Sequence, residues 1–107
     1  MKINELQPES TFDEIKARLL SKQGPQIIKI KGRRSYLWQL LLIDETGTIA
    51  LTLWGVNAAD EFRIGQVLKV TDGWCKVFGD IKQISKGKAG NIEVVADDPV
   101  LPRSLPV

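Results

Sequence analysis

The chain contains no histidine and only one cysteine, Cys75, and these two absences restrict its chemistry. A single cysteine cannot form an internal disulfide, and without histidine a transition-metal site of ordinary ligand spacing cannot be assembled. Histidine is also the commonest general base, and no Ser, Cys or Lys stands in a recognisable nucleophile motif. We therefore expect no cofactor, no metal and no enzymatic activity. Because free cysteines are often buried, Cys75 is expected to be a small core residue.

Long apolar runs are also lacking. No segment approaches the ~20 apolar residues that cross a bilayer, and the stretch from Met1 to Glu5 contains no apolar signal core. The 107 residues, 43% of them hydrophobic, suit one domain with a single core. We therefore expect a cytoplasmic protein with no membrane partner.

Acidic residues are missing from Lys22 to Ile43, although the formal net charge of the whole chain is only +2. Residues 22–90 hold eleven Lys or Arg against six Asp or Glu, and the two ends of the chain carry the compensating acid. A run of this kind is often just a solvated face. It also favours a domain with one locally positive edge.

Local signals divide the chain into an N-terminal arm, one domain and an extended proline-containing tail, over residues 1–9, 10–97 and 98–107. Thr11 followed by Glu14 has the spacing of a helix capping box, and apolar residues then recur at intervals of three and four. Gly24 and Pro25 are typical of a helix end. The spacing predicts a packing helix over 11–22, ahead of a β-barrel over 26–95.

Short strand patterns separated by turn residues fill the rest of the domain. In the clearest, from Thr48 to Trp54, apolar residues alternate with small or polar ones. Asp44–Gly47 and Gly79–Asp80 predict hairpin turns, and Asn57 to Phe62 predicts a short helix between the third and fourth strands. Five or six hairpin-linked strands in this order predict a mainly β fold, a small barrel of the oligonucleotide-binding (OB) type.

Four large aromatics stand on or beside these strands, and flat rings among lysines and arginines suit an unpaired nucleic-acid strand. Trp54 shares its strand face with small and polar side chains, which places it outside the core. Trp38 shares its strand face with Leu40 and Leu42, so a core position is nearly as well supported for Trp38 as a binding role. The four residues are Trp38, Trp54, Trp74 and Phe78.

Trp74 and Phe78 share one strand face with Lys76. Val70 has the same parity as Trp74, yet belongs to an apolar strand that should face the core. A bulge or twist near Gly73 must therefore exchange the two faces if these aromatics are to point outward.

Several segments in order resemble the OB-fold domains of archaeal single-stranded-DNA-binding proteins and of replication protein A. They are Ile43–Gly47, Leu51–Gly55, Gly65–Val67 and Trp74–Gly79, and the resemblance extends over roughly residues 26–95. It implies that Trp54, Trp74 and Phe78 stack on bases, as the matching aromatics do in the archaeal proteins. In replication protein A the matching stacking aromatic falls at Trp38.

We therefore expect a nucleoid-associated protein that binds single-stranded DNA, without catalysis, in replication, recombination or repair. Rings would stack on bases while cations neutralise phosphates. Two alternatives stay open: a single-stranded RNA binder, and an OB-fold interaction subunit that joins replication or repair proteins or other OB-fold subunits. The candidate phosphate contacts are Arg33, Arg34, Lys76, Lys82, Lys86 and Lys88.

Overall fold

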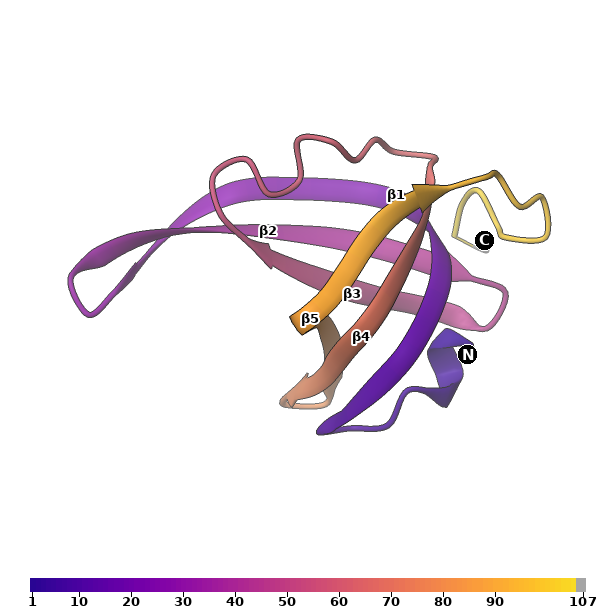
Figure 1. Cartoon of the computed structure of the whole chain (residues 1–107), viewed down its shortest axis with the longest axis horizontal. Coiled ribbons are helices and arrows are strands. Elements are labelled where there is room, and N and C mark those ends of the chain that lie inside the picture. The colour runs from indigo at the N-terminus through magenta and orange to yellow at the C-terminus, as the bar shows by residue number, and fades with distance from the viewer. Residues whose placement is uncertain (106–107) are drawn as a thin grey trace.

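Five strands close into a barrel in the computed structural model, which describes residues 1–105 (Figure 1). After a short 3-10 turn, η1 Ile3–Glu5, the strands are β1 Ser10–Ile30, β2 Arg33–Asp44, β3 Gly47–Trp54, β4 Val67–Phe78 and β5 Ile81–Val95. Their order around the barrel is β1-β2-β3-β5-β4, and every observed pairing is antiparallel except that of β3 with β5. The predicted mainly β barrel of the OB type is confirmed.

The helix predicted over residues 11–22 is wrong, because this segment forms the first half of β1. One half of β1 pairs with β4 and the other with β2, so this long strand closes the barrel. Ile15 and Leu19 are four residues apart, a spacing that puts both on one face of a helix or of a strand. Ala17, between them, is also fully buried, which is the two-residue period of a strand. Pairing with two neighbours outweighs the local capping signal.

The short helix predicted over Asn57–Phe62 is likewise replaced by successive turns. The N–H groups of Ala58, Asp60 and Phe62 each donate to the carbonyl three residues earlier, at 3.1–3.2 Å. The Lys22 ammonium holds this connection to the barrel, because it donates to the carbonyls of Ala59 and Phe62 at 3.0 Å. Tertiary contacts therefore determine the path of the connection, and the local propensity of the segment does not.

β4 exchanges its two faces at Asp72, which meets the condition that the sequence set for Trp74 and Phe78 to point outward. Val70 is buried before this point and Cys75 after it, so the inward parity changes. Asp72 has a positive φ of 52°, and the pairing with β5 shifts register here because residues 87–90 loop out of the ladder. A Cβ on Gly73 would lie 2.2 Å from the Phe12 ring, so only glycine fits at this crossing.

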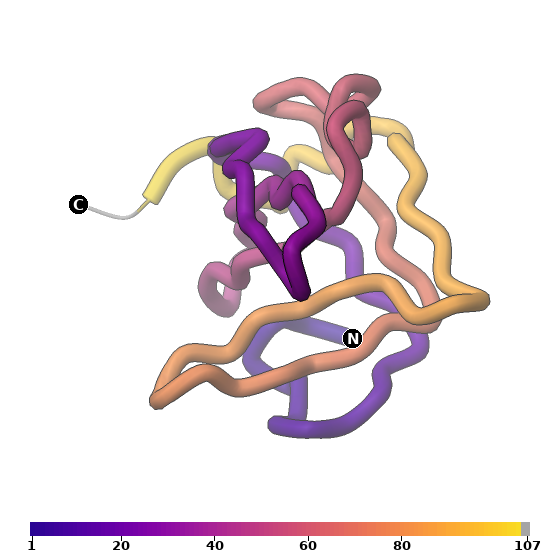
Figure 2. The backbone as a smooth tube through the Cα atoms, turned by 90° about the vertical axis from the view of Figure 1, so that its left-hand side faces the viewer, coloured from indigo at the N-terminus to yellow at the C-terminus, as the bar shows by residue number. Residues whose placement is uncertain are grey.

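Two hairpins extend from the barrel, the β1–β2 hairpin to the left in Figure 1 and the β4–β5 hairpin along its lower edge, and Figure 2 shows that they point in different directions. The tip of the β1–β2 hairpin is Lys31–Gly32, with positive φ at both residues as a type I′ turn requires. Arg33 and Arg34 therefore lie in β2, directly after the turn. In the β4–β5 hairpin the predicted two-residue turn is confirmed, with Phe78 opposite Ile81.

The end of the barrel opposite the β1–β2 hairpin carries the beginning of the chain and the segment after β5 (Figure 1). Ile3 and Leu6, in the predicted arm, are buried against the barrel. Leu101, in the predicted tail, is buried as well, whereas residues 106 and 107 of that tail lie outside the described residues. Within residues 1–105 no helix is long and apolar enough to cross a membrane.

Candidate nucleic-acid interface

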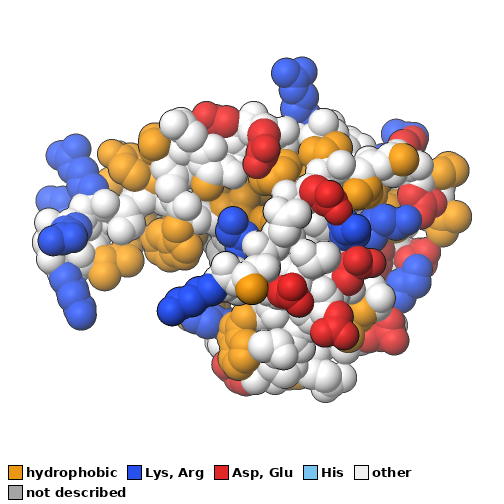
Figure 3. All heavy atoms as spheres, viewed as in Figure 1, with side chains coloured by type: hydrophobic (Ala, Val, Ile, Leu, Met, Phe, Trp, Pro, Cys, Tyr) orange, Lys and Arg blue, Asp and Glu red, His pale blue; other side chains and the backbone are white. Residues whose placement is uncertain are grey.

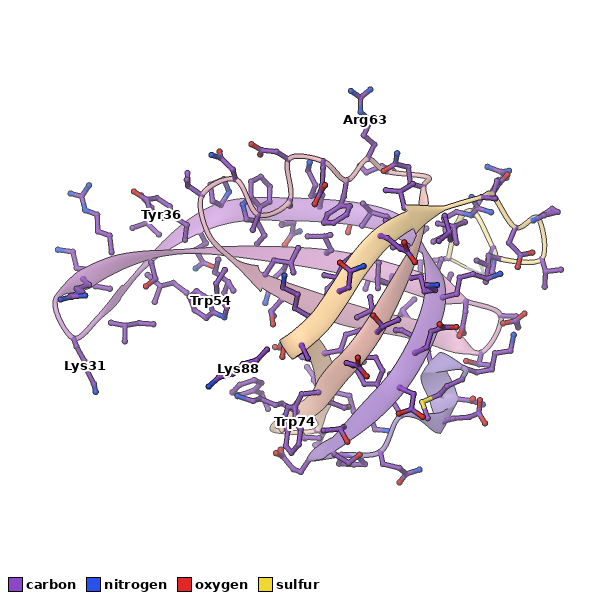
Figure 4. The ribbon with its side chains drawn as sticks, in the orientation of Figure 1. Lys31, Tyr36, Trp54, Arg63, Trp74 and Lys88 are labelled. Atoms are coloured by element: carbon purple, nitrogen blue, oxygen red, sulfur yellow. The ribbon has the colours of Figure 1, made fainter. Side chains whose placement is uncertain are left out.

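The surface is hollowed between the projecting β1–β2 hairpin and the body of the barrel (Figure 3). Trp54 lies on one side of this hollow and Trp74 on the other, with Lys88 between them in the same view (Figure 4). A depression of about 190 Å³, which we call the groove, is formed here by β2, β3, β4 and β5. Its lining residues are Leu37, Gln39, Thr52, Trp54, Lys76, Phe78, Gln83 and Ser85.

Trp54 ends β3 with its side chain 54% exposed, whereas Leu53 before it is buried. The alternation predicted for this strand is therefore confirmed, and it turns the indole outward. The strand stops here because the chain turns away at Gly55, whose N–H donates to the Tyr36 carbonyl at 2.8 Å. Trp54 consequently stands at the mouth of the groove, with a large apolar surface open to a ligand.

The face exchange in β4 directs Trp74, Lys76 and Phe78 outward together. Phe78 is 61% exposed, Lys76 is exposed and Trp74 is half-buried. Phe78 and Lys76 line the groove with Trp54, because β3 and β4 both flank β5. Trp74 lies two residues from Lys76 on the same face. Two separate strands thus bring rings and one cation to a single groove.

Trp38 is placed in the core and not in the groove. It is only 8% exposed, and its indole N–H donates to the Val56 carbonyl at 3.2 Å. The Lys22 ammonium lies 5.3 Å from the centre of its ring, a cation–π contact. Leu40 and Leu42, on the same strand face, are fully buried. The ring of Trp38 therefore supports the barrel and the β3–β4 connection.

Most of the predicted phosphate contacts are free cations. Arg33 and Arg34 lie on the projecting hairpin, and all but one of the six predicted residues are exposed, with no ion pair to any residue from 1 to 105. The exception is Lys82, which is half-buried and donates to the Leu6 carbonyl at 2.8 Å. Lys82 therefore holds the N-terminal segment to β5.

Sequence reasoning did not select two further cations, Lys29 and Lys31, on the same hairpin. Lys29 is the cross-strand partner of Arg34, so the hairpin concentrates positive charge near its tip. The run without acidic residues was the signal that could have identified them. The polar residues Glu61 and Asn91, described below, carried no such signal, because tertiary folding alone brings them near Trp54.

Outside the groove, the surroundings of three ionisable side chains shift their pKa values. Cys75 is buried as predicted, and this burial raises the pKa of its thiol. A hydrogen bond from the Arg18 guanidinium lowers the pKa of Asp97, and one from Lys16 lowers the pKa of Asp98. Within the described chain, no group of His, Cys, Asp and Glu side chains suits a metal ion.

The barrel topology and its groove define the class of the protein as an OB-fold domain. The chain matches no protein-family model. It is 28% identical over 97 residues to the single-stranded DNA binding protein Ssb of Saccharolobus solfataricus, covering 91% of this chain and 65% of that relative.

Solved structures give the same result. The second OB-fold domain of replication protein A from Methanococcus maripaludis has a TM-score of 0.72 and 29% identity, over 92% of this chain and 96% of that domain. A chain of a replication protein A heterotrimer bound to ssDNA has a TM-score of 0.77 and 20% identity, over 98% of this chain and 27% of that one. The chain is thus an OB-fold domain similar to those of archaeal single-stranded-DNA-binding proteins and of replication protein A. None of these names denotes an enzyme.

Proposed function

We propose that this domain binds single-stranded DNA by stacking bases on its exposed rings while the free cations around the hollow neutralise phosphates. The observation that carries the proposal is that Trp54 from β3 and Phe78 from β4 line one groove together with Lys76. The similarity to Ssb, whose name states this ligand, and to a chain of a replication protein A heterotrimer solved bound to ssDNA supports it.

Stacking supplies the preference for unpaired strands. An exposed ring contributes about 1–3 kcal/mol per stacked base, whatever the base. A duplex keeps its base faces occupied, so it offers the rings nothing equivalent. Trp54, Trp74 and Phe78 are the proposed stacking residues, and the burial of Trp38 removes it from this set.

Phosphate neutralisation supplies the second part of the affinity. Arg33 and Arg34 on one side of the hollow, and Lys76, Lys86 and Lys88 on the other, are mobile exposed cations that can displace counterions from a strand. Lys29 and Lys31 extend this charge toward the hairpin tip. A strand held between the two hairpins would then have rings below it and cations on both sides.

In the cell, we propose that the domain acts on the single strands exposed in replication, recombination or repair, in association with the nucleoid. The chain is similar to one chain of a heterotrimer, so we propose other OB-fold subunits as its partners. Proteins of replication, recombination or repair are further proposed partners. RNA offers the same base faces, so the titration below includes it.

Intrinsic tryptophan fluorescence tests the proposal directly. Titration with a short oligo-dT should quench Trp54 and Trp74 and leave the buried Trp38 as an internal reference. Trp54→Ala and Trp74→Ala should each weaken binding by about tenfold or more, with unchanged circular dichroism. Ile64→Ala is the matched control, because Ile64 is 67% exposed but lies outside the groove.

Parallel titrations with matched RNA and duplex DNA define the ligand class. Tighter binding of RNA would replace DNA with RNA as the ligand. If no oligonucleotide quenches the fluorescence, stacking on these rings is wrong. A defined oligomer in light scattering, without any oligonucleotide binding, would instead favour the interaction-subunit alternative.

A further inference from the structure

Beside the groove lies a second depression of about 320 Å³, which we call the recess. It is enclosed by β3, by the β3–β4 connection and by β5, and it shares Thr52, Trp54 and Ser85 with the groove. Its volume is at the lower end of the range of small-molecule sites, roughly 300–1,000 Å³. A strand stacked on Trp54 therefore has room for one more group beside it.

The recess combines an apolar wall with a few polar groups. Trp54, Phe62 and Ile92 supply flat or apolar surface, and Phe62 is itself held by the Lys22 contact to its carbonyl. Such walls accept an aromatic ring and disfavour a phosphate, because a phosphate would lose its hydration there. The occupant that fits is a nucleobase.

Three polar side chains line the recess without partners of their own. Within residues 1–105, the side chains of Glu61, Ser85 and Asn91 make no hydrogen bond or ion pair. Lys86 is the only cation in the lining. A carboxylate repels phosphate, so the base edge should face Glu61 while the backbone follows Lys86.

The carboxylate discriminates among the four bases. A carboxylate only accepts hydrogen bonds, and its two oxygens can accept a parallel pair. Guanine presents two adjacent donors, N1–H and the N2 amino group. Adenine and cytosine present one amino donor beside an acceptor nitrogen, and thymine presents one N–H between two carbonyl oxygens. Ser85 and Asn91 supply donors of the kind that a carbonyl such as guanine O6 needs.

We propose that the recess is a nucleobase site that selects guanine through Glu61. This inference rests on the proposed function, since the base arrives as part of a bound single strand. It gives the domain a preferred register on mixed sequences, with guanine beside the base stacked on Trp54. The remaining positions are bound without sequence preference.

The test uses fluorescence titrations of the full chain with a set of oligo-dT strands that carry one guanine at successive positions. The strand with guanine at one of these positions should bind about tenfold more tightly than oligo-dT, because a bidentate contact to a base edge discriminates against the other bases. Replacing that guanine with hypoxanthine removes the N2 amino group and should abolish most of the gain. Glu61→Gln should abolish it too, whereas Asp60→Asn, the neighbouring exposed acid outside the recess, should not.

The outcomes separate the two proposals. Equal affinity for every strand in the set, or an unchanged guanine preference in Glu61→Gln, would overturn the guanine site while normal oligo-dT binding leaves the proposed function intact. A gain that survives the hypoxanthine replacement would also overturn it. Failure of every strand to bind would overturn both.

Discussion

Two regions of the barrel use the same kind of side chain in opposite ways. At the end with the N-terminal turn and the segment after β5, cations are paired: Lys2 with Glu45 at 2.6 Å and Lys16 with Asp98 at 2.9 Å. The exposed cations around the hollow, by contrast, have no ion pair with any residue of the described chain. Their charge is therefore not neutralised by an ion pair.

This difference shows why net charge is a poor guide to the ligand. A chain with a formal charge of +2 would not be expected to attract a polyanion. The six ion pairs within residues 1–105 involve Lys2, Lys16, Arg18, Lys69 and Arg103, and none of them involves a predicted phosphate contact. The location of unpaired charge, more than its sum, marks the surface that can exchange counterions with a nucleic acid.

Substitution of Arg18 should give the largest effect, and it should change the stability of the fold without changing the affinity for DNA. It is 1% exposed and donates to the carbonyls of Gly65, Asp98, Leu101 and Pro102. Arg18→Ala leaves these acceptors without their donor, and should cost about 3 kcal/mol or more in urea unfolding. Oligo-dT affinity of the folded variant should stay unchanged. Arg103→Ala is the control, since Arg103 also pairs with Asp97 but is exposed, and it should cost under about 1 kcal/mol.

Two lysines on β4 compare a free cation with a paired one. Lys76 lines the groove, whereas Lys69 is held by Glu93 at 2.9 Å. Lys76→Gln should weaken oligo-dT binding a few-fold and reduce the slope of log affinity against log salt by about 0.7. Lys69→Gln should alter neither. Equal effects of the two substitutions would show that pairing does not decide which cations contact phosphate.

Lys82 is an intermediate case: it is a predicted phosphate contact, but its ammonium is engaged in a hydrogen bond within the protein. Because its ammonium donates to the Leu6 carbonyl, Lys82→Gln should lower the free energy of unfolding by about 1 kcal/mol. The salt slope should stay the same as in the wild type. A reduced slope without a stability change would return Lys82 to the set of phosphate contacts.

The smallest effect is a loss of stability in acid from the paired end. The pKa values of Asp97 and Asp98 are lowered in the folded state by Arg18 and Lys16, respectively. The unfolded chain therefore binds protons first, and stability falls as the pH drops below the ordinary Asp pKa of about 3.9. Melting temperatures between pH 7 and pH 3 measure this loss. The Asp97→Asn variant should show a shallower decline, and an equally steep one would exclude Asp97 as its source.

Sequence patterns were sufficient wherever one face of a strand decided the outcome. The alternation in β3 predicted the exposure of Trp54, and the parity conflict between Val70 and Trp74 indicated that outward-facing aromatics in β4 require a face exchange. They failed where helix and strand periods coincide, as for Ile15 and Leu19 in β1. Sequence patterns also could not show which cations form hydrogen bonds within the fold, because the carbonyl that accepts from Lys82 lies 76 residues away in the sequence.

The face exchange at Asp72 also has a consequence for how such a domain changes over evolutionary time. It divides β4 into a half that packs the core through Leu68 and Val70 and a half that displays Trp74 and Phe78. Substitutions in the displayed half can retune ligand preference without repacking the interior. Gly73, at the junction of the two halves, cannot vary in the same way, since a side chain at position 73 would collide with the ring of Phe12. A domain built this way can diversify its ligands while its scaffold stays constant.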